Sequence, residues 1–349
     1  RYTLKSDEQL LKAGHCVAYN QFVVRPLDYA AYIKQQLNSE MPKVAPVLDL
    51  ETRTVTGVDF EVAFDGRGRL CSYIYNGKQM ISKPIFPQFY RAMTENDYGV
   101  RKRTSNAIYY HSWKAFRNAE TYMDLFLMKE QENRVVVTAE YSYSEIGMSV
   151  EVRYEIDGDG NIAASVTMIP GKPKFDIKGM LRFGMDMAMP SSFDTIEFYG
   201  AGGSESYADR KSGTPVGIYR QSVAEQFCMT YVRPQESGSH CDLRWWRVTD
   251  STGSGLEVRS DMIIKNIDTL PREQWESIPT PKMSTEQYKH LMQYVDMDNP
   301  ALWLREMTFA GFYAHRTMTD VLPADHPIME NAMSSEYFVK ARNLQLTDE

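Results

Sequence analysis

Apolar and polar side chains alternate along Val58-Asp59-Phe60-Glu61-Val62-Ala63-Phe64. This period of two predicts a β-strand with one face buried and the other in solvent. The turn-forming residues Asp65-Gly66-Arg67-Gly68 follow, and a second strand is predicted from Leu70 to Tyr75. That strand ends at Asn76-Gly77, a dipeptide typical of a tight β-hairpin turn. The stretch therefore predicts an antiparallel sheet of short strands.

The same alternation continues downstream. Further strands are predicted over 135–143, 149–156 and 162–169, and many short strands at regular spacing favour a large antiparallel sandwich. The turn Asp157-Gly158-Asp159-Gly160-Asn161 imitates the start of a calcium-binding EF-hand loop. Such a loop needs a Glu at its twelfth position and flanking helices, whereas the twelfth residue here is Met168 and both flanks alternate as strands. We therefore expect a β-turn that binds no calcium.

A chain of 349 residues has room for two domains. Residues 15–24 predict a strand that breaks at Pro26, and because a lone strand is unstable, its partners are expected to precede Arg1. We interpret 1–26 as the end of a preceding β-domain, 27–46 as a linker with a helical turn around 29–36, and 47–349 as the sandwich. Past residue 261 the pattern is ambiguous, and 284–295 and 300–307 are compatible with helices, the first capped by Ser284.

Composition excludes several classes of protein. The 43% hydrophobic and 24% charged residues are ordinary for a globular protein, and a net charge of −7 without basic blocks argues against binding nucleic acid or anionic membranes. No apolar run reaches the length of about 18 residues that a membrane-spanning helix needs.

The four Cys show no CxxC spacing and the six His no zinc spacing, so neither a disulfide framework nor a metal site is predicted. The start at Arg1, without Met or signal peptide, is typical of a fragment, so the compartment is left open.

Three segments carry the strongest signal. They are Phe89-Tyr90-Arg91-Ala92-Met93-Thr94-Glu95-Asn96-Asp97-Tyr98-Gly99, Gly200-Ala201-Gly202-Gly203-Ser204-Glu205-Ser206-Tyr207-Ala208-Asp209-Arg210 and Tyr231-Val232-Arg233-Pro234-Gln235-Glu236-Ser237-Gly238-Ser239-His240-Cys241-Asp242-Leu243-Arg244-Trp245. In this order and spacing they resemble the small-chain, C-terminal region of bacterial β-galactosidases of the lactose-operon type, glycoside hydrolase family 2. Met93, Glu95 and Gly203 depart from that pattern, in which Pro, Asp and Pro are usual. Residues 262–349 also lack the Gly-rich Ser-Trp segment usual in the family.

The resemblance implies an all-β, galactose-mutarotase-like antiparallel supersandwich, preceded by the closing strand of an immunoglobulin-like domain near residues 12–22. It implies a role in hydrolysing terminal β-galactosides with retention. Retention requires two carboxyl groups about 5 Å apart. The resemblance puts both on an upstream barrel, so no catalytic residue is expected in this chain, which alone is expected to be inactive. No cofactor or metal is expected here either, and any Mg²⁺ or Na⁺ of the intact enzyme would be bound upstream.

The expected partners are the upstream barrel and β-domains of the same polypeptide and the β-galactoside, and a homo-oligomer is left open. The compartment would be the bacterial cytoplasm or periplasm. Substrate-binding residues are expected in the loop after the first segment, at the rim of the pocket: Gly99, Arg101 and Arg103. A glycine hinge followed by three basic residues is also compatible with a solvated surface loop.

Alternatives remain at the other two segments. Glu205, Asp209 and Arg210 are compatible with acid–base chemistry, although a structural turn in which Arg210 pairs with a carboxylate is favoured. Glu236 and Asp242 with Arg233 and Arg244 are interpreted as a polar network. Trp245 and Trp246 should face opposite sides of a strand, so at most one contacts sugar. A free-standing carbohydrate-binding or aldose-epimerase-like module is the rival function, although the scattered His disfavour an epimerase.

Overall fold

The computed structural model describes residues 1–26, 28, 31–32, 44–91, 115–116, 119–171, 183–207, 210–226, 231, 237–268, 311–314 and 333–343. For 260–268, 311–314 and 333–343 only the backbone is described. In these ranges the elements are strands, apart from the 3-10 helix η2 (Val223–Gln226) and helical residues at 31–32 and 115–116. The strand pairings of the described chain are antiparallel. The all-β prediction is confirmed.

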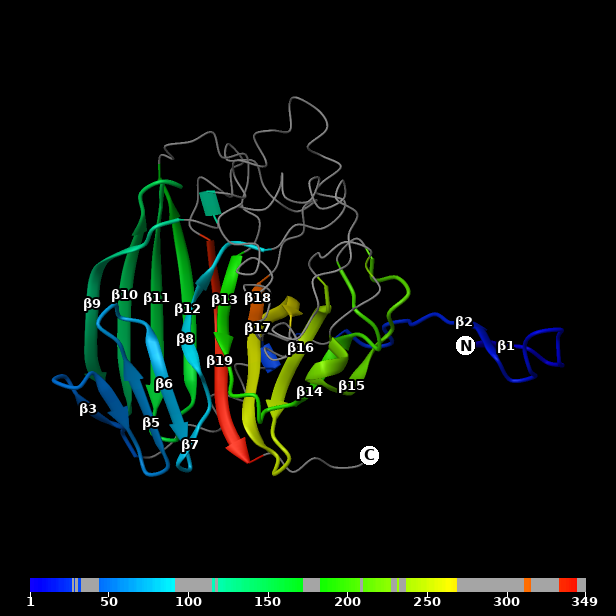
Figure 1. Ribbon diagram of the computed structural model, residues 1–349, viewed down its shortest axis with the longest axis horizontal. Coiled ribbons are helices and arrows are strands. Elements are labelled where there is room, and N and C mark those ends of the chain that lie inside the picture. Colours follow the sequence, from blue (N-terminus) through cyan, green and yellow to red (C-terminus); the bar gives the residue numbers. More distant parts are fainter. Residues whose placement is uncertain are drawn as a thin grey trace, which may run out of the picture.

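The strands from β3 to β19 form one hydrogen-bonded system, arranged as two sheets that are joined where β17 pairs with β18 (Figure 1). In the order of pairing, the first sheet contains β9 (Tyr122–Gln131), β10 (Arg134–Tyr143), β11 (Met148–Asp157), β12 (Ile162–Pro170), β19 (Met333–Asn343), β17 (Ser254–Asp268), β16 (Ser239–Thr249), β14 (Thr195–Ala201) and β15 (Val216–Ser222). The second contains β3 (Val47–Asp49), β4 (Thr54–Thr56), β5 (Phe60–Phe64), β6 (Leu70–Tyr75), β8 (Lys83–Gln88), β13 (Phe183–Ala188) and β18 (Gly311–Ala314), with β7 (Lys78–Gln79) on β6. Because β18 also pairs with the end of β17, the two sheets are joined there.

The core lies between the sheets and follows from the alternation in the sequence. Along β10 every second residue is buried, beginning with Val135 and Val137. Phe64 from the second sheet packs against Phe126 and Tyr154 of the first, with ring centroids 5.9 Å and 5.6 Å apart. Burial of such aromatic and branched side chains is the main stabilising contribution to a fold of this kind.

The two predicted hairpin turns are present. Asn76 and Gly77 have φ of 49° and 72°, the left-handed pair that a two-residue type I′ turn requires, and Tyr75 pairs with Lys78 across it. At the other turn, Asp157 Oδ1 accepts the N–H groups of Asp159 at 3.0 Å and Asn161 at 2.9 Å. Strands β11 and β12 continue on both sides of this turn, so the prediction of a β-turn at 157–161 is confirmed.

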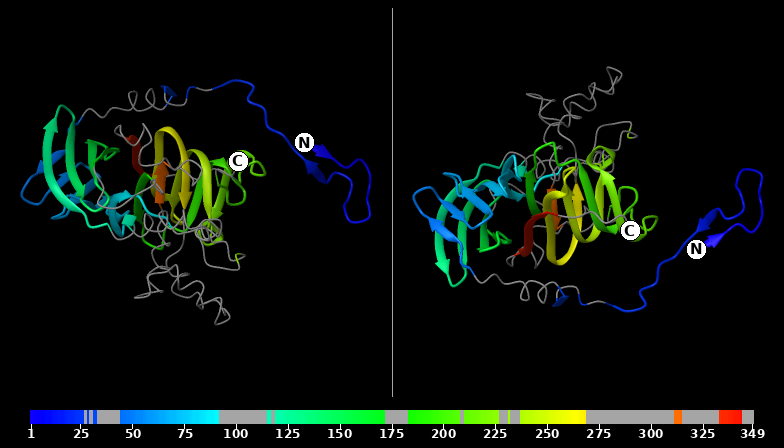
Figure 2. Two further views of the ribbon diagram at one scale, coloured as in Figure 1. Left: turned by 90° about the horizontal axis from the view of Figure 1, so that it is seen from above. Right: turned by 90° about the horizontal axis from the view of Figure 1, so that it is seen from below.

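The strand predicted over 15–24 is shorter in the structure. Strand β2 covers Cys16–Ala18, and among the described residues it pairs with β1 (Tyr2–Thr3) alone. A strand persists only where a neighbour takes up its backbone hydrogen bonds, so the prediction of ten residues was wrong. The β1–β2 sheet lies apart from the sandwich (Figure 2), and its assignment to an immunoglobulin-like domain stays a prediction, as does the division at residues 26 and 46.

The C-terminal quarter contributes strands that the sequence pattern did not reveal. Strand β19 lies between β12 and β17, with Val339 opposite both Ile162 and Val258. The helices considered at 284–295 and 300–307 lie outside the described residues. In the part of the chain that the structure describes, no helix is long and apolar enough to cross a membrane.

Candidate functional site

The second and third sequence segments meet where β14 passes into its loop and β16 begins. Gly200 lies on β14 beside β16, and a Cβ there would clash with the Leu243 side chain and come within 3.1 Å of the Cys241 carbonyl oxygen. Gly203 turns the loop with a φ of +87°, a conformation that favours glycine. These glycines allow the loop to fold back against β16 rather than continue β14.

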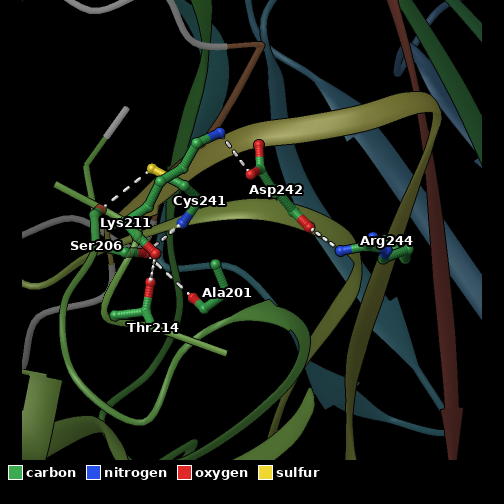
Figure 3. Close-up of polar contacts among 7 residues, drawn as sticks. All are labelled: Ala201, Ser206, Lys211, Thr214, Cys241, Asp242 and Arg244. Atoms are coloured by element: carbon green, nitrogen blue, oxygen red, sulfur yellow. Dashed lines mark hydrogen bonds and ion pairs between the residues drawn. The ribbon is translucent and has the colours of Figure 1, made fainter. Parts of the chain in front are cut away.

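Ser206 joins the folded-back loop to β16 (Figure 3). Its backbone N–H donates to the Ser239 carbonyl at 2.6 Å. Its hydroxyl donates to the Ala201 carbonyl at 3.1 Å and accepts the Cys241 N–H at 2.9 Å. Ser206 is fully buried, so these bonds satisfy polar groups that water cannot reach.

Glu205 is the centre of a polar cluster that we call the Glu205 cluster, made of Glu205, Arg210, Tyr231 and Gly238. Its side chain is only 11% exposed and forms an ion pair with Arg210. The Tyr231 hydroxyl donates to Oε1 of Glu205, and the Gly238 N–H donates to Oε2 at 2.8 Å. Charge-assisted bonds of this kind are roughly twice as strong as those between neutral groups. The carboxylate therefore acts as a fixed acceptor that joins three parts of the chain, as the structural interpretation predicts; Asp209 lies outside the described residues.

His240 lies next to this cluster in an apolar environment. Its ring stacks on Phe198 with centroids 4.2 Å apart, Nε2 is hydrogen-bonded to Oε1 of Gln226, and Nδ1 is buried without a hydrogen-bond partner. Burial lowers the pKa of His240 to about 4, against the opposing effect of the Glu205 charge. The imidazole is therefore neutral at physiological pH. Sequence inspection counted this residue among the scattered His and gave it no role.

Asp242 extends the polar contacts along β16. It has a positive φ of 57°, next to the irregular pairing of β16 with β17. Its carboxylate accepts a hydrogen bond from Lys211 Nζ at 2.6 Å, and its carbonyl accepts one from Arg244 at 2.6 Å (Figure 3). The predicted polar network is thus present for Asp242 and Arg244, with Lys211 as a member the sequence did not suggest. Glu236 and Arg233 lie outside the described residues.

The adjacent tryptophans face opposite sides of β16, as predicted. Trp246 is fully buried opposite Phe198, whereas Trp245 is partly exposed opposite Tyr199. The ring of Tyr199 lies 6.5 Å from that of Trp245, and the Arg244 guanidinium lies over the Tyr199 ring at 5.1 Å. Of the two tryptophans, Trp245 is the one that a ligand or another part of the protein can reach.

Residues 56–327 match the model of the family described as beta galactosidase small chain. The chain belongs to this family. The match includes strands of both sheets and contains all three sequence segments, so the resemblance on which the sequence interpretation depended is confirmed at this level.

Curated relatives of this chain carry the name β-galactosidase. The protein from Priestia megaterium is 28% identical over 297 residues, which are 85% of this chain and 27% of that protein. The one from Halalkalibacterium halodurans is 30% identical over 262 residues, 74% of this chain and 25% of that protein. The chain thus spans about a quarter of the length of these relatives. Among solved structures, a putative aldose 1-epimerase from Escherichia coli is similar, with 10% identity, a TM-score of 0.43 and coverage of 83% of this chain and 98% of that one.

The first segment of the small chain starts in the core. Phe89 is buried and packs edge-on against Tyr143, with ring centroids 5.6 Å apart, and Arg91 is also buried. The Gln88 side-chain oxygen accepts the N–H groups of Phe89 and Tyr90 at 3.0 Å and 2.9 Å, which fixes the exit of the chain from β8. The predicted rim residues Gly99, Arg101 and Arg103 lie outside the described residues, and their role stays a prediction.

A network of charges on the outer face of the first sheet was missed by sequence inspection. Arg247 of β16 pairs with Glu197 of β14 and lies 4.0 Å from Glu257 of β17, which in turn pairs with Arg259 at 2.7 Å. These residues lie far apart in sequence, and only the strand register brings them together. Among the described side chains, no group of three or more His, Cys, Asp or Glu is arranged to bind a metal ion.

Proposed function

We propose that this small chain is the C-terminal part of a longer β-galactosidase of the lactose-operon type, glycoside hydrolase family 2, which hydrolyses terminal β-galactosides with retention. The observation that carries the proposal is the family match over 56–327, together with the relatives named β-galactosidase, of which the chain spans about a quarter. The order and spacing of the three sequence segments support the same assignment.

In this proposal the sandwich walls and supports an active site whose two carboxylates lie on an upstream barrel. Glu205, on which an acid–base role in this chain would depend, has its carboxylate engaged by Arg210, Tyr231 and Gly238. A carboxylate held by three donors fixes the positions of the segments that it joins. The loop with Gly99, Arg101 and Arg103 would form part of the rim of the sugar pocket.

The test compares the intact polypeptide with this chain alone on an aryl β-galactoside. The intact protein is expected to release the aryl group at a normal glycosidase rate, and NMR of the first-formed sugar is expected to show the β-anomer, as retention requires. The chain alone is expected to release none. Turnover by the chain alone, or an α-anomer from the intact protein, would contradict the proposal, and binding of galactosides without any hydrolysis would favour a carbohydrate-binding module.

A further inference from the structure

A side-chain amide of the N-terminal segment is bound to the edge of the first sheet. Gln21 Nε2 donates to the Val216 carbonyl at 2.8 Å, and the Val216 N–H donates to Gln21 Oε1 at 2.6 Å. The Tyr19 hydroxyl donates to the carbonyl of Gly213, three residues before Val216 in the loop that leads into β15. Gln21 thus satisfies both backbone groups of one residue, as a neighbouring strand would.

These contacts lie on the open side of β15. In the described chain this strand pairs with β14 and with no other strand. The bonds to Gln21 show that the backbone groups of Val216 point away from β14. Because this direction alternates along an antiparallel strand, the backbone groups of Ile218 point the same way. A strand edge without a neighbouring strand is a template for pairing with further chain.

Exposed apolar side chains lie close to Val216, the residue to which Gln21 is bound. Ile218 is 65% exposed, and Tyr199 lies opposite it on β14 and is 36% exposed. With Arg244 over the Tyr199 ring and Trp245 beside it, the patch has the aromatic and arginine composition typical of protein interfaces.

The N-terminal segment carries exposed apolar side chains just after its contacts with the sandwich. Tyr19 and Gln21 are hydrogen-bonded to the sandwich. The apolar residues that follow, Phe22, Val23 and Val24, are 80%, 81% and 97% exposed. Side chains as apolar as these are normally buried, so a further unit is expected to pack on them.

We propose that the open side of β15, from residue 213 to Ile218 together with Tyr199, is the surface on which the sandwich docks against the β-unit that contains residues 1–24 in the intact protein. This rests on the proposed function in one respect, namely that the chain is part of a longer polypeptide. The hydrogen-bonded side chains of Tyr19 and Gln21 bury far less surface area than the roughly 600–1,500 Å² that is typical of interfaces between domains. The docked unit therefore extends over Ile218 and Tyr199, with Gln21 holding its edge.

The test uses the intact polypeptide with Gln21→Ala and Ile218→Asp. The matched control is Leu127→Asp, which places the same charge at an exposed apolar position of the other edge strand, β9. The measurements are the rate of limited proteolysis between residues 22 and 46 and the hydrogen exchange of the amides in β15. Each test variant is expected to raise the cleavage rate about tenfold, since the undocked fraction rises when two hydrogen bonds or an apolar contact are lost. The control is expected to leave both measurements unchanged.

The proposal is overturned if Ile218→Asp behaves like Leu127→Asp, or if Gln21→Ala leaves β15 as protected as before. A change from dimer to monomer on Ile218→Asp with unchanged proteolysis would assign the surface to a second copy and likewise overturn it. Should Ile218→Asp fail to fold, Ile218→Ser serves the same comparison. Hydrolysis of the aryl β-galactoside by the unaltered intact protein is measured separately. If that protein is inactive but the test variants still increase cleavage and hydrogen exchange in β15, the proposed function is refuted and the docking surface stands.

Discussion

Glu205 shows how one side chain can hold together segments that are remote in sequence. Its partners Tyr231 and Gly238 follow it by 26 and 33 residues, and both belong to the third sequence segment. The carboxylate is nearly buried, so removing it takes away an acceptor from a phenol hydroxyl and from a backbone N–H.

We predict that Glu205→Ala lowers the free energy of unfolding by about 2 kcal/mol, because the part-buried Tyr231 hydroxyl and the buried Gly238 N–H lose their acceptor. Glu61→Ala, at an exposed position of β5, should change it by less than about 0.5 kcal/mol. Urea unfolding of the purified chain measures both. Equal effects of the two substitutions would show that the Glu205 cluster contributes nothing to stability.

His240 predicts a dependence of stability on pH. Because its pKa is lowered by burial from 6.5 to about 4, the unfolded chain binds a proton between these values and the folded chain does not. The free energy of unfolding is therefore highest above about pH 6.5, where His240 is neutral in both states, and it falls as the pH is lowered towards 4. This decrease amounts to about 2 kcal/mol between pH 7 and pH 5.

Replacing His240 by Gln should reduce the difference in unfolding free energy between pH 7 and pH 5 by that amount, whatever its effect at either pH alone. His15→Gln, at an exposed position, is the control. Unfolding curves at the two pH values supply the numbers, and an unchanged difference in His240→Gln would refute a buried neutral imidazole.

At the scale of elements, the β6–β7 hairpin fixes one end of the second sheet to the first. Lys78, just after its turn, forms an ion pair with Asp250 at the turn between β16 and β17. Burial alone would raise the pKa of Asp250, but hydrogen bonds from Lys78, Thr252 and the Ser254 N–H lower it to about 2. The hairpin geometry therefore also positions a contact between sheets.

The turn of this hairpin offers a matched pair of glycines. A Cβ would meet no atom within 4 Å at Gly77 or at Gly66, but only Gly77 has a positive φ, of 72°. We predict that Gly77→Ala costs about 1 kcal/mol of unfolding free energy, because a side chain strains the left-handed conformation, whereas Gly66→Ala is neutral or slightly stabilising. Thermal unfolding compares the two, and equal melting temperatures would contradict the assigned turn.

At the scale of the whole molecule, the loop after the first segment is proposed to gate the site of the intact enzyme. Gly99→Ala there should change kcat and KM together and leave the melting temperature nearly unchanged, because a hinge residue controls loop closure rather than the core. Gly66→Ala, in a turn of the second sheet, should leave the kinetics alone. Steady-state kinetics with a melting curve distinguishes gating from a surface loop: unchanged kcat and KM in a folded Gly99→Ala enzyme would end the gating proposal.

The rest of the candidate site was only partly predictable. The pairing of Arg210 with a carboxylate and the opposite facing of Trp245 and Trp246 were expected from the sequence, and both are present. His240 gave no signal, because a lone His has no local pattern that separates a buried ring from an exposed one. The partners of Arg247 could not be inferred either, since they depend on which strands become neighbours.

The sequence by itself determined the strands with a clear period of two, the turns at Asn76-Gly77 and at 157–161, and the family. These features are local: alternation reports which face of a strand is buried, and turn residues report permitted backbone angles. Tertiary structure alone decided that β19 lies between β12 and β17, that Glu205 joins the second and third sequence segments, and that Gln21 binds the edge of β15. The physical reason is that neighbours in a sheet are chosen by the burial of whole faces and by long-range backbone hydrogen bonds, which no short stretch of sequence encodes.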